Sequence, residues 1–320
     1  MTQKSSSSEY GIHNNHRELR TRKSDLSTTQ SLRANTRERG ANKMASTSST
    51  ALLMEAPAGR HFAQLHKDPQ VLADAVGVFV ETGLIRNEAV IVIAPLASVP
   101  SYLQRLEGTG KSAQVWQKSG QLTVLDGPVL LSRVMKDDMP QWDEFRESIG
   151  QVLESGGAHN WKGIRVYGEM VNDLWRAGHT AAAIRLEEYW NELARVYQFC
   201  LFCGYHVDSM NEASYADPLH EIGRTHTDIL ATQEDDHLWE ALNRAAKEVL
   251  GIPLSQMLIY SGCQGHSGAQ QLSRGYQAML WIKRNVPEAM NSIVMRTREI
   301  YADETNPKGL LPQRLRVSTS

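Results

Sequence analysis

The stretch from Gly163 to Tyr205 constrains the fold most, because its pattern predicts a strand, two helices and a second strand in succession. The expected strands are residues 163–168 and 198–205, and the expected helices between them are residues 169–177 and 180–197. Neighbouring strands joined by so long a connection run parallel, since a tight turn joins only antiparallel strands. Glu169 would then lie at the carboxyl edge of the sheet, where open α/β sheets bind ligands.

The preceding part of the chain repeats this alternation. Residues 88–94 are almost all aliphatic, which indicates a strand buried on both faces of a parallel sheet. Asp68 and Pro69 start a helix, because Asp accepts hydrogen bonds from the free amides of the first turn and Pro is tolerated there. Other strands are expected at 60–65 and 121–126, and helices at 68–82, 100–108, 129–135 and 142–154. Five strands alternating with helices predict a three-layer α/β domain with a mostly parallel sheet of five or more strands.

The two ends of the chain differ from this domain. Residues 1–48 hold nine Lys or Arg against four Asp or Glu and almost no aliphatic clusters, so we expect a disordered basic tail. The tail is either simply solvated or contacts a phosphate backbone or an acidic partner. Later helices are expected at 219–231, 236–250, 272–285 and 289–301. The predicted organisation is a tail at 1–48, an α/β domain at 56–215, a helical region at 216–302 and a flexible tail at 303–320.

Composition favours a cytoplasmic protein without a membrane anchor. No apolar run approaches the roughly 20 residues that a membrane helix requires, and no secretory signal opens the chain. Three cysteines are too few for a disulfide framework, which favours a reducing compartment. A net charge of −2 gives no whole-chain reason to expect a nucleic-acid partner.

One segment resembles the end of a phosphate-binding loop. Residues 108–112 read GTGKS, but the full motif needs a Gly where Arg105 stands and a strand in front of the loop. The loop that follows the first strand, at residues 66–70, has no Gly and is too short to wrap a phosphate. We therefore expect neither a cofactor nor catalysis, with a weak ATPase kept as an alternative.

The other candidate chemistry has ordinary structural explanations. Cys200 and Cys203 point to opposite faces of a strand, so their sulfurs cannot share a zinc ion, and we expect both to be buried structural residues. Cys263 and His266 form an isolated pair in a glycine-rich loop. Three glutamates on one helix, together with Arg185 and Arg195, suggest solvated ion pairs; they are Glu187, Glu188 and Glu192. No metal site is expected.

Polar and aromatic residues converge at the predicted carboxyl edge of the sheet. His66, Asp126, Glu169 and Tyr205 each lie near the carboxyl end of a strand, a composition typical of a small-ligand pocket. In the alternative interpretation, Asp126 and Glu169 cap the helices that follow them. The full set of candidate ligand-binding residues is His61, His66, Asp126, Glu169, Met170, Trp175 and Tyr205.

Several ordered blocks carry a resemblance to a known family. They are residues 61–66 (HFAQLH), 79–84 (FVETGL), 88–94 (EAVIVIA), 120–126 (GQLTVLD), 168–171 (GEMV) with Leu174 and Trp175, and 186–193 (LEEYWNEL). Together they make the chain from about His61 to Tyr205 resemble the MEDS domain, a sensory domain named after methanogens, methylotrophs and the dichloromethane-responsive regulator. The resemblance covers a little under half of the chain.

The resemblance implies a fold related to RecA and KaiC type ATPases, in a degenerate form without a working phosphate loop. Glu169 takes the place of the acidic residue that ends the second nucleotide-binding strand. Members sense small organic compounds and pass the signal to kinase, sigma-factor-related or helix-turn-helix modules. Residues 1–48 do not resemble a helix-turn-helix, and the lone His226 does not make a phosphoacceptor, so the output is undetermined.

Sequence and resemblance together predict a non-catalytic cytoplasmic sensor. It would bind a small organic ligand and signal to a regulatory protein, either a kinase, a sigma-related factor or a transcription regulator. The alternatives are a residual nucleotide-binding protein or ATPase, and a transcription-associated module whose basic tail binds DNA. A homodimer is compatible with all three interpretations.

Overall fold

A computed structural model describes residues 49–157, 160–208, 218–260 and 273–305, all of which belong to one compact unit. The predictions made for the tail at 1–48, for Cys263 and His266, and for residues beyond 305 lie outside the described residues. Within the described part of the chain, no helix is long and apolar enough to cross a membrane.

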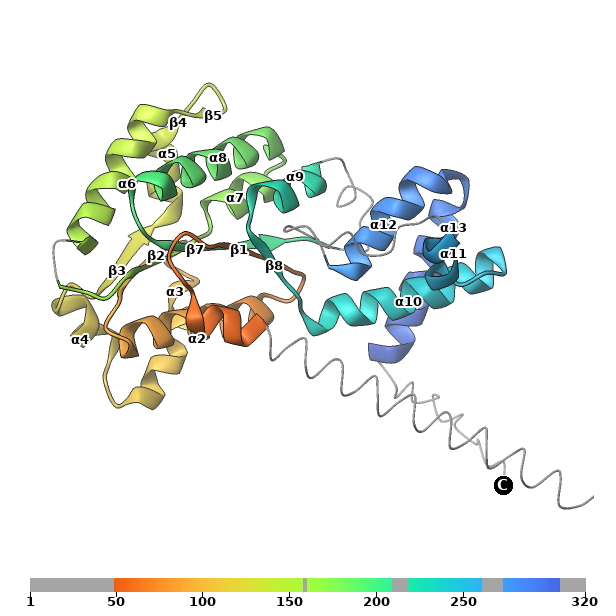
Figure 1. Cartoon of the computed structure of the whole chain (residues 1–320), viewed down its shortest axis with the longest axis horizontal. Helices are drawn as coiled ribbons and strands as arrows, with labels where there is room; N and C mark the ends of the chain where they lie inside the picture. Colours follow the sequence, from red (N-terminus) through yellow and green to blue (C-terminus); the bar gives the residue numbers. More distant parts are fainter. Residues whose placement is uncertain (1–48, 158–159, 209–217, 261–272, 306–320) are drawn as a thin grey trace, which may run out of the picture. The chain divides into compact units, whose positions relative to one another are not determined.

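A six-stranded parallel sheet forms the centre of the fold (Figure 1). Its strand order is β3-β2-β6-β7-β1-β8, so each connection leads either to a parallel neighbour or past one or two strands. The strands are β1 (His61–His66), β2 (Ala89–Ala94), β3 (Leu122–Asp126), β6 (Ile164–Gly168), β7 (Cys200–His206) and β8 (Asp228–Leu230). The predicted β-α-β unit is confirmed, because β6 and β7 pair directly and in parallel.

Helices cover both faces of this sheet, which confirms the three-layer α/β prediction (Figure 1). One face packs against α5 (Gly127–Val134), α6 (Trp142–Gly157), α7 (Met170–Arg176), α8 (Thr180–Val196) and α9 (Pro218–Thr225). The opposite face packs against α2 (Pro69–Ile85), α3 (Val99–Leu103), η1 (Gln104–Thr109) and α4 (Ala113–Lys118). Successive residues of a strand serve different faces, so in β7 Phe202 joins the α2 side while Cys203 joins the α8 side.

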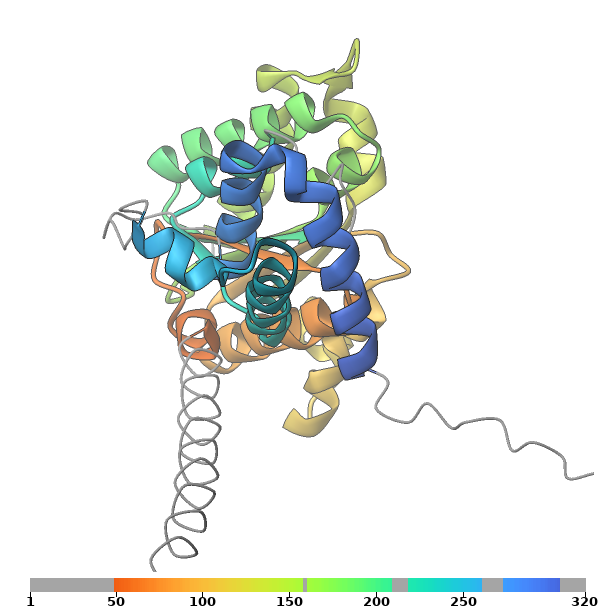
Figure 2. The same cartoon turned by 90° about the vertical axis from the view of Figure 1, so that its right-hand side faces the viewer.

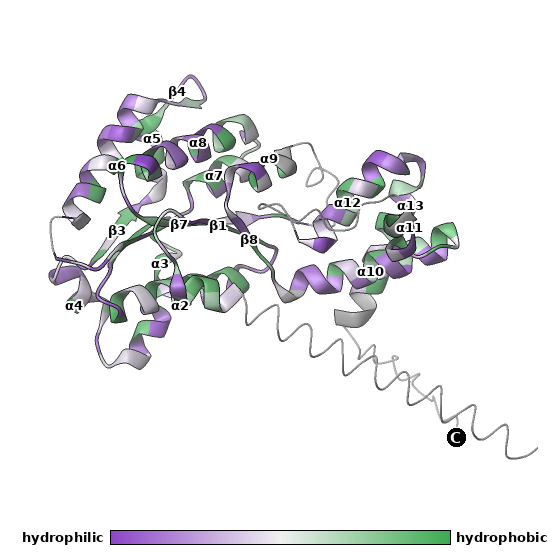
Figure 3. Cartoon of the chain, in the orientation of Figure 1, coloured by the Kyte–Doolittle hydropathy of each residue, from purple (hydrophilic) through white to green (hydrophobic). Residues whose placement is uncertain are grey.

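Local sequence explains how these elements begin and how deeply they are buried. Asp68 caps α2 by accepting a hydrogen bond from the Gln70 amide at 2.8 Å, with Pro69 in the first turn. Every residue of β2 is buried, as its aliphatic run predicts. The hydropathy colouring in Figure 3 shows the same contrast between apolar central strands and helices with one polar face.

Arg165 is a fully buried charge that ties a preceding helical segment to the sheet. It projects from β6, where it is 1% exposed. Its guanidinium donates to the carbonyl oxygens of Leu53 at 2.7 Å, Met54 at 2.9 Å and Phe79 at 3.3 Å, and its Nε pairs with the carboxylate of Glu88. Each of its three nitrogens therefore has at least one acceptor, which offsets the cost of removing this cation from water.

The C-terminal helices build a core of their own, and Figure 2 shows them gathered side by side. They are α10 (Gln233–Leu250), α11 (Leu254–Tyr260), α12 (Arg274–Asn285) and α13 (Pro287–Thr305). Leu242, Ile282 and Ile293, from three of these helices, are completely buried. Thr232 and Asp235 form a reciprocal capping box at the start of α10. The prediction of a helical C-terminal region is confirmed for the described residues.

The predicted helix at 219–231 is wrong beyond Thr225. Here α9 ends at Thr225, and residues 228–230 form β8, which pairs in parallel with β1. The Thr227 amide donates to the His61 carbonyl at 2.8 Å and so extends this ladder. A strand of three residues is too short to show a period of two in the sequence. Three other short elements were not predicted: α4, α11 and the hairpin β4 (Met135–Lys136) and β5 (Met139–Pro140).

Replacing Gly83 by Ala should destabilise the protein. An added Cβ would lie 2.7 Å from Cδ of Arg165 and 2.8 Å from Cγ2 of Val90, and the Arg165 side chain is held by its hydrogen bonds. We expect urea unfolding to show a loss of about 1–3 kcal/mol, typical of overpacking. Gly157→Ala is the matched control, because its Cβ meets nothing within 4 Å. Equal stability of the two variants would contradict the tight fit at Gly83.

Candidate functional site

The structure distributes the predicted ligand-binding residues among several places. His61 and Tyr205 lie in a buried polar cluster around Glu187. His66 ends β1 and Glu169 directly follows β6, so both lie at the carboxyl edge of the sheet. Met170 is buried in the apolar core, and Trp175 packs edge-on against Tyr205 with 5.6 Å between ring centroids. Asp126 ends β3 and is only partly buried.

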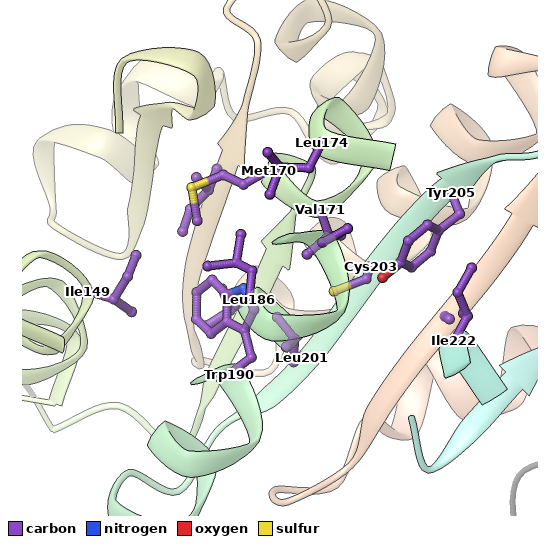
Figure 4. Packing of buried hydrophobic residues seen from close by; sticks show 14 of the residues in the cluster. Ile149, Met170, Val171, Leu174, Leu186, Trp190, Leu201, Cys203, Tyr205 and Ile222 are labelled. Atoms are coloured by element: carbon purple, nitrogen blue, oxygen red, sulfur yellow. The ribbon is translucent and has the colours of Figure 1, made fainter. Parts of the chain in front are cut away.

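Glu187 is the centre of the buried cluster. Its Oε2 lies 3.1 Å from Nε2 of His61, and its Oε1 lies 3.2 Å from Nε2 of His226. The Tyr205 hydroxyl donates to Oε1, and the Cys203 sulfur lies 3.8 Å from Oε2. Figure 4 shows Cys203 and Tyr205 projecting from β7 toward the side on which Leu186 and Ile222 lie.

The prediction of a solvated Glu187 is wrong, since its side chain has no exposed surface. Glu187 lies four residues after Ala183 and three before Trp190, both of which are buried against the sheet. Residues at these spacings share one face of a helix, so this stripe was the signal that could have revealed the burial. Glu188 and Glu192 are more exposed and do form ion pairs, with Arg185 and Arg195 respectively.

Burial and neighbouring groups act in opposite directions on the pKa of Glu187. Burial alone would raise its pKa, but His226 and His61 together hold that pKa below the usual value. Burial lowers the pKa of His61, and the neighbouring His226 lowers it further. Burial, followed by the charge of Glu187, raises the pKa of the Cys203 thiol and of the Tyr205 hydroxyl, so both keep their protons at neutral pH.

Glu169 lies between two tyrosines. The hydroxyl of Tyr167 donates to Oε1 at 2.7 Å, and the hydroxyl of Tyr102 donates to the same oxygen. Burial raises the pKa of Glu169, while the two hydroxyl donors and Arg176 oppose that rise. Glu169 and Asp126 occupy the N-cap positions of the helices that follow them, as the capping alternative expects, but neither side chain makes a cap hydrogen bond.

Four more polar groups complete the carboxyl edge, which we define as His66, His206, Asp173 and Arg176 together with Glu169. The ring centroids of His66 and His206 lie 5.8 Å apart on adjacent strands. Arg176 exerts its positive charge on His66, Glu169 and Asp173 alike, so these groups share one electrostatic environment. His206 is further joined to α7, since its amide donates to Oδ1 of Asn172 at 2.8 Å.

Two buried polar atoms at this edge have no hydrogen-bond partner among the described residues. They are Nδ1 of His66 and Oδ2 of Asp173. Burial and then His206 lower the pKa of His66 to about 4, whereas burial and then Glu169 raise the pKa of Asp173 to about 6. Buried polar atoms are normally paired, so these two mark a place suited to a ligand. Asp173 and Arg176 were missed because their helix was predicted only as a connection.

A surface groove of about 440 Å³ lies elsewhere, between α3, η1 and α4. It includes Ser112 from the segment that resembles a phosphate loop, but that segment follows α3 and η1 rather than a strand. The loop between β1 and α2 is only Lys67 and Asp68, and Asp68 caps the helix. The geometry therefore offers no cradle for phosphate after β1.

His66 should make stability depend on pH. The pKa of His66 is about 4 in the folded state and 6.5 in the unfolded state. The contribution of neutral His66 to the free energy of unfolding is therefore present above pH 6.5 and is lost as pH falls toward 4. The charged groups that act on it are His206, Arg176 and Asp68. Between pH 7 and pH 4 the wild type should lose up to about 3 kcal/mol more than His66→Asn in urea unfolding. A variant at exposed His179 should follow the wild type, and parallel pH profiles for His66→Asn would contradict the prediction.

Comparison with protein families gives one clear result. Residues 60–227, more than half of the chain, match the model of the MEDS domain, described as the MEthanogen/methylotroph, DcmR Sensory domain. The match ends at Thr227, directly before β8, and it includes both the Glu187 cluster and the carboxyl edge. No curated protein matches the chain. The family's description suggests a sensory role in signalling, and this chain belongs to the MEDS family.

Proposed function

We propose that this chain is a non-catalytic sensor that binds a small organic molecule at the carboxyl edge. The observation that carries the proposal is the pair of buried, unpartnered atoms, Nδ1 of His66 and Oδ2 of Asp173. They lie at the edge where parallel α/β sheets bind ligands, and Arg176 acts on both residues. A ligand with hydrogen-bonding groups would satisfy both atoms.

The chemistry of this edge favours a small ligand that combines polar and apolar surface. At neutral pH the lowered pKa keeps His66 uncharged, so its ring offers a neutral donor or acceptor. Asp173 offers a carboxylate oxygen, and Arg176 a cation. Trp175, on the same helix as both, is partly buried and contributes apolar surface. A few polar groups beside aromatic surface are typical of small-molecule sites.

The described contacts also offer a route from this edge to the C-terminal helices. Lys67 follows His66, and its amide donates to Oε2 of Glu234 in the first turn of α10 at 3.1 Å. The next residue, Asp235, accepts from the Ser273 hydroxyl at 2.7 Å, just before α12. Tyr276 of α12 is buried with the core of the α8 side. Ligand binding transmits a signal only if it favours one packing of these helices over another.

The output in this proposal is a regulatory protein in the cytoplasm, either a kinase, a sigma-related factor or a transcription regulator. A nucleotide-binding protein or ATPase has less support, because the loop after β1 is two residues long and holds no Gly. DNA binding through residues 1–48 concerns residues outside the described part of the chain.

A thermal-shift screen of the full chain tests the ligand site. The screen should include short alcohols, halogenated hydrocarbons, small carboxylic acids, amines and nucleotides. We expect one organic class to raise Tm, and we expect Asp173→Asn and Arg176→Gln to abolish most of that rise, because both remove polar partners of the ligand. Arg185→Gln is the matched control, since Arg185 is an exposed arginine of α8 that pairs with Glu188.

Two outcomes would contradict the proposal. One is the absence of stabilisation by any class. The other is ATP turnover that Glu169→Gln abolishes, which would establish the nucleotide alternative instead.

Hydrogen exchange tests the route to the C-terminal helices. The ligand found in the screen should change amide protection in the first turns of α10, because Glu234 links that helix to the loop after β1. Glu234→Ala should remove this change while leaving ligand affinity within about twofold, since an exposed side-chain hydrogen bond contributes little to stability. Glu288→Ala, at the exposed start of α13, is the control. Unchanged protection in α10 on ligand binding would contradict this route.

A further inference from the structure

We propose that His61, Glu187, Cys203 and His226 form a binding site for a divalent transition-metal ion of the zinc type. The four residues are 0–3% exposed, and their candidate ligand atoms all lie within 4.8 Å of one another. The site is separate from the carboxyl edge and does not rest on the ligand-binding proposal. It departs from the sequence-based expectation of no metal, because His61, Glu187 and Cys203 had each been assigned another role.

Distances between the donor atoms suit tetrahedral coordination. Zinc lies about 2.0–2.1 Å from nitrogen and oxygen ligands and about 2.3 Å from sulfur, which places neighbouring donors about 3.3–3.6 Å apart. The two imidazole nitrogens lie 3.1 and 3.2 Å from the carboxylate oxygens of Glu187. The sulfur of Cys203 lies 3.5 Å from Nε2 of His61 and 3.8 Å from Oε2 of Glu187. Small side-chain adjustments therefore suffice to close the site around an ion.

The hydrogen bonds of the two histidines point their Nε2 lone pairs at the carboxylate. Nδ1 of His226 lies 2.6 Å from the carbonyl oxygen of Ile222, which can only accept, so Nδ1 carries the proton. Nδ1 of His61 lies 3.0 Å from Oδ1 of Asn191. The orientation of that amide is settled by its other end, because Nδ2 of Asn191 donates to the carbonyl oxygen of Thr225 at 2.8 Å. A neutral imidazole with its proton on Nδ1 has only a lone pair left on Nε2.

This arrangement calls for a cation at the centre of the cluster. Two lone pairs facing a carboxylate repel it unless a proton or a metal ion lies between them. Metal-binding histidines characteristically donate their second ring nitrogen to a carbonyl or carboxylate, as both histidines do here with carbonyl or amide oxygens. Tyr205 plays the same supporting part for Glu187 by donating to its Oε1.

The donor types select the ion. One thiol, two imidazoles and one carboxylate suit zinc and neighbouring transition metals, whereas magnesium and calcium prefer oxygen ligands throughout. On binding, the Cys203 thiol loses its proton to solvent and a metal–sulfur bond forms, so each ion bound releases one proton. The thiolate and the Glu187 carboxylate then balance the two positive charges. Four protein ligands leave no open position, which is typical of a structural site.

Such an ion would connect segments that are far apart in the sequence. His61 comes from β1, Glu187 from α8 and Cys203 from β7, and His226 lies between α9 and β8. The segment that holds His226 continues through β8 into α10. Metal binding would therefore couple the stability of the sheet to the start of the C-terminal region.

The test measures metal in the full chain, purified without a polyhistidine tag. Inductively coupled plasma mass spectrometry should find about one zinc per chain. After removal of that zinc by a chelator, cobalt(II) added alone should bind and show thiolate-to-cobalt charge-transfer absorbance. Cys203→Ser should lose that absorbance, and His226→Gln should lose most of the bound metal. Asn191→Ala should weaken zinc affinity about 10–100-fold, as outer-shell substitutions do.

Cys200→Ser is the matched control, since Cys200 is a buried thiol of the same strand that faces the opposite core. It should keep both the zinc and the cobalt absorbance. Circular dichroism establishes that each variant is folded. The wild-type measurement decides the matter even if a variant unfolds: a folded wild type that retains no metal and gives no cobalt charge transfer overturns the proposal. Equal metal binding by Cys203→Ser, Cys200→Ser and the wild type would overturn it as well.

Discussion

An ionised carboxylate buried away from water is stable only if nearby groups replace its hydration, and Glu187 imposes this condition on the whole α/β domain. Its partners come from β1, from β7 and from the segment between α9 and β8. Removing one of these partners would leave the Glu187 charge buried without compensation, at a cost of several kcal/mol. The condition therefore specifies how β1 and β7 are aligned, which way α8 is rotated, and where the chain returns to the sheet after α9.

The two polar regions of the domain differ in what surrounds them. The Glu187 cluster is enclosed by the apolar core on the α8 side of the sheet, where His61, His226 and Tyr205 face its carboxylate. The carboxyl edge includes the exposed Arg176 and contains polar atoms without partners among the described residues. An enclosed cluster suits the maintenance of a framework, whereas a partly open edge suits exchange of a ligand with solvent.

The sequence was sufficient for features that depend on local pattern. The aliphatic run of β2, the Asp68 cap of α2 and the alternation of Cys200 and Cys203 between faces follow from spacing and residue type, and the structure agrees with each. It was insufficient where the outcome depends on distant residues. Glu187 resembles a solvated helix residue until α8 is seen against β1 and β7, and His226 resembles a lone histidine until α9 returns the chain to His61. His61 lies more than a hundred positions from both Glu187 and His226, a separation that no local period records.

The C-terminal helices join the sheet through β8. It is one of the two edge strands of the sheet, it spans three residues, and it pairs with β1 alone. Few backbone hydrogen bonds hold it, so the sheet opens there at lower free energy than at β6 or β7, which are flanked on both sides. The chain continues from β8 directly into α10. The C-terminal helices are thus joined to the sheet through its shortest strand, which is held by the fewest backbone pairings.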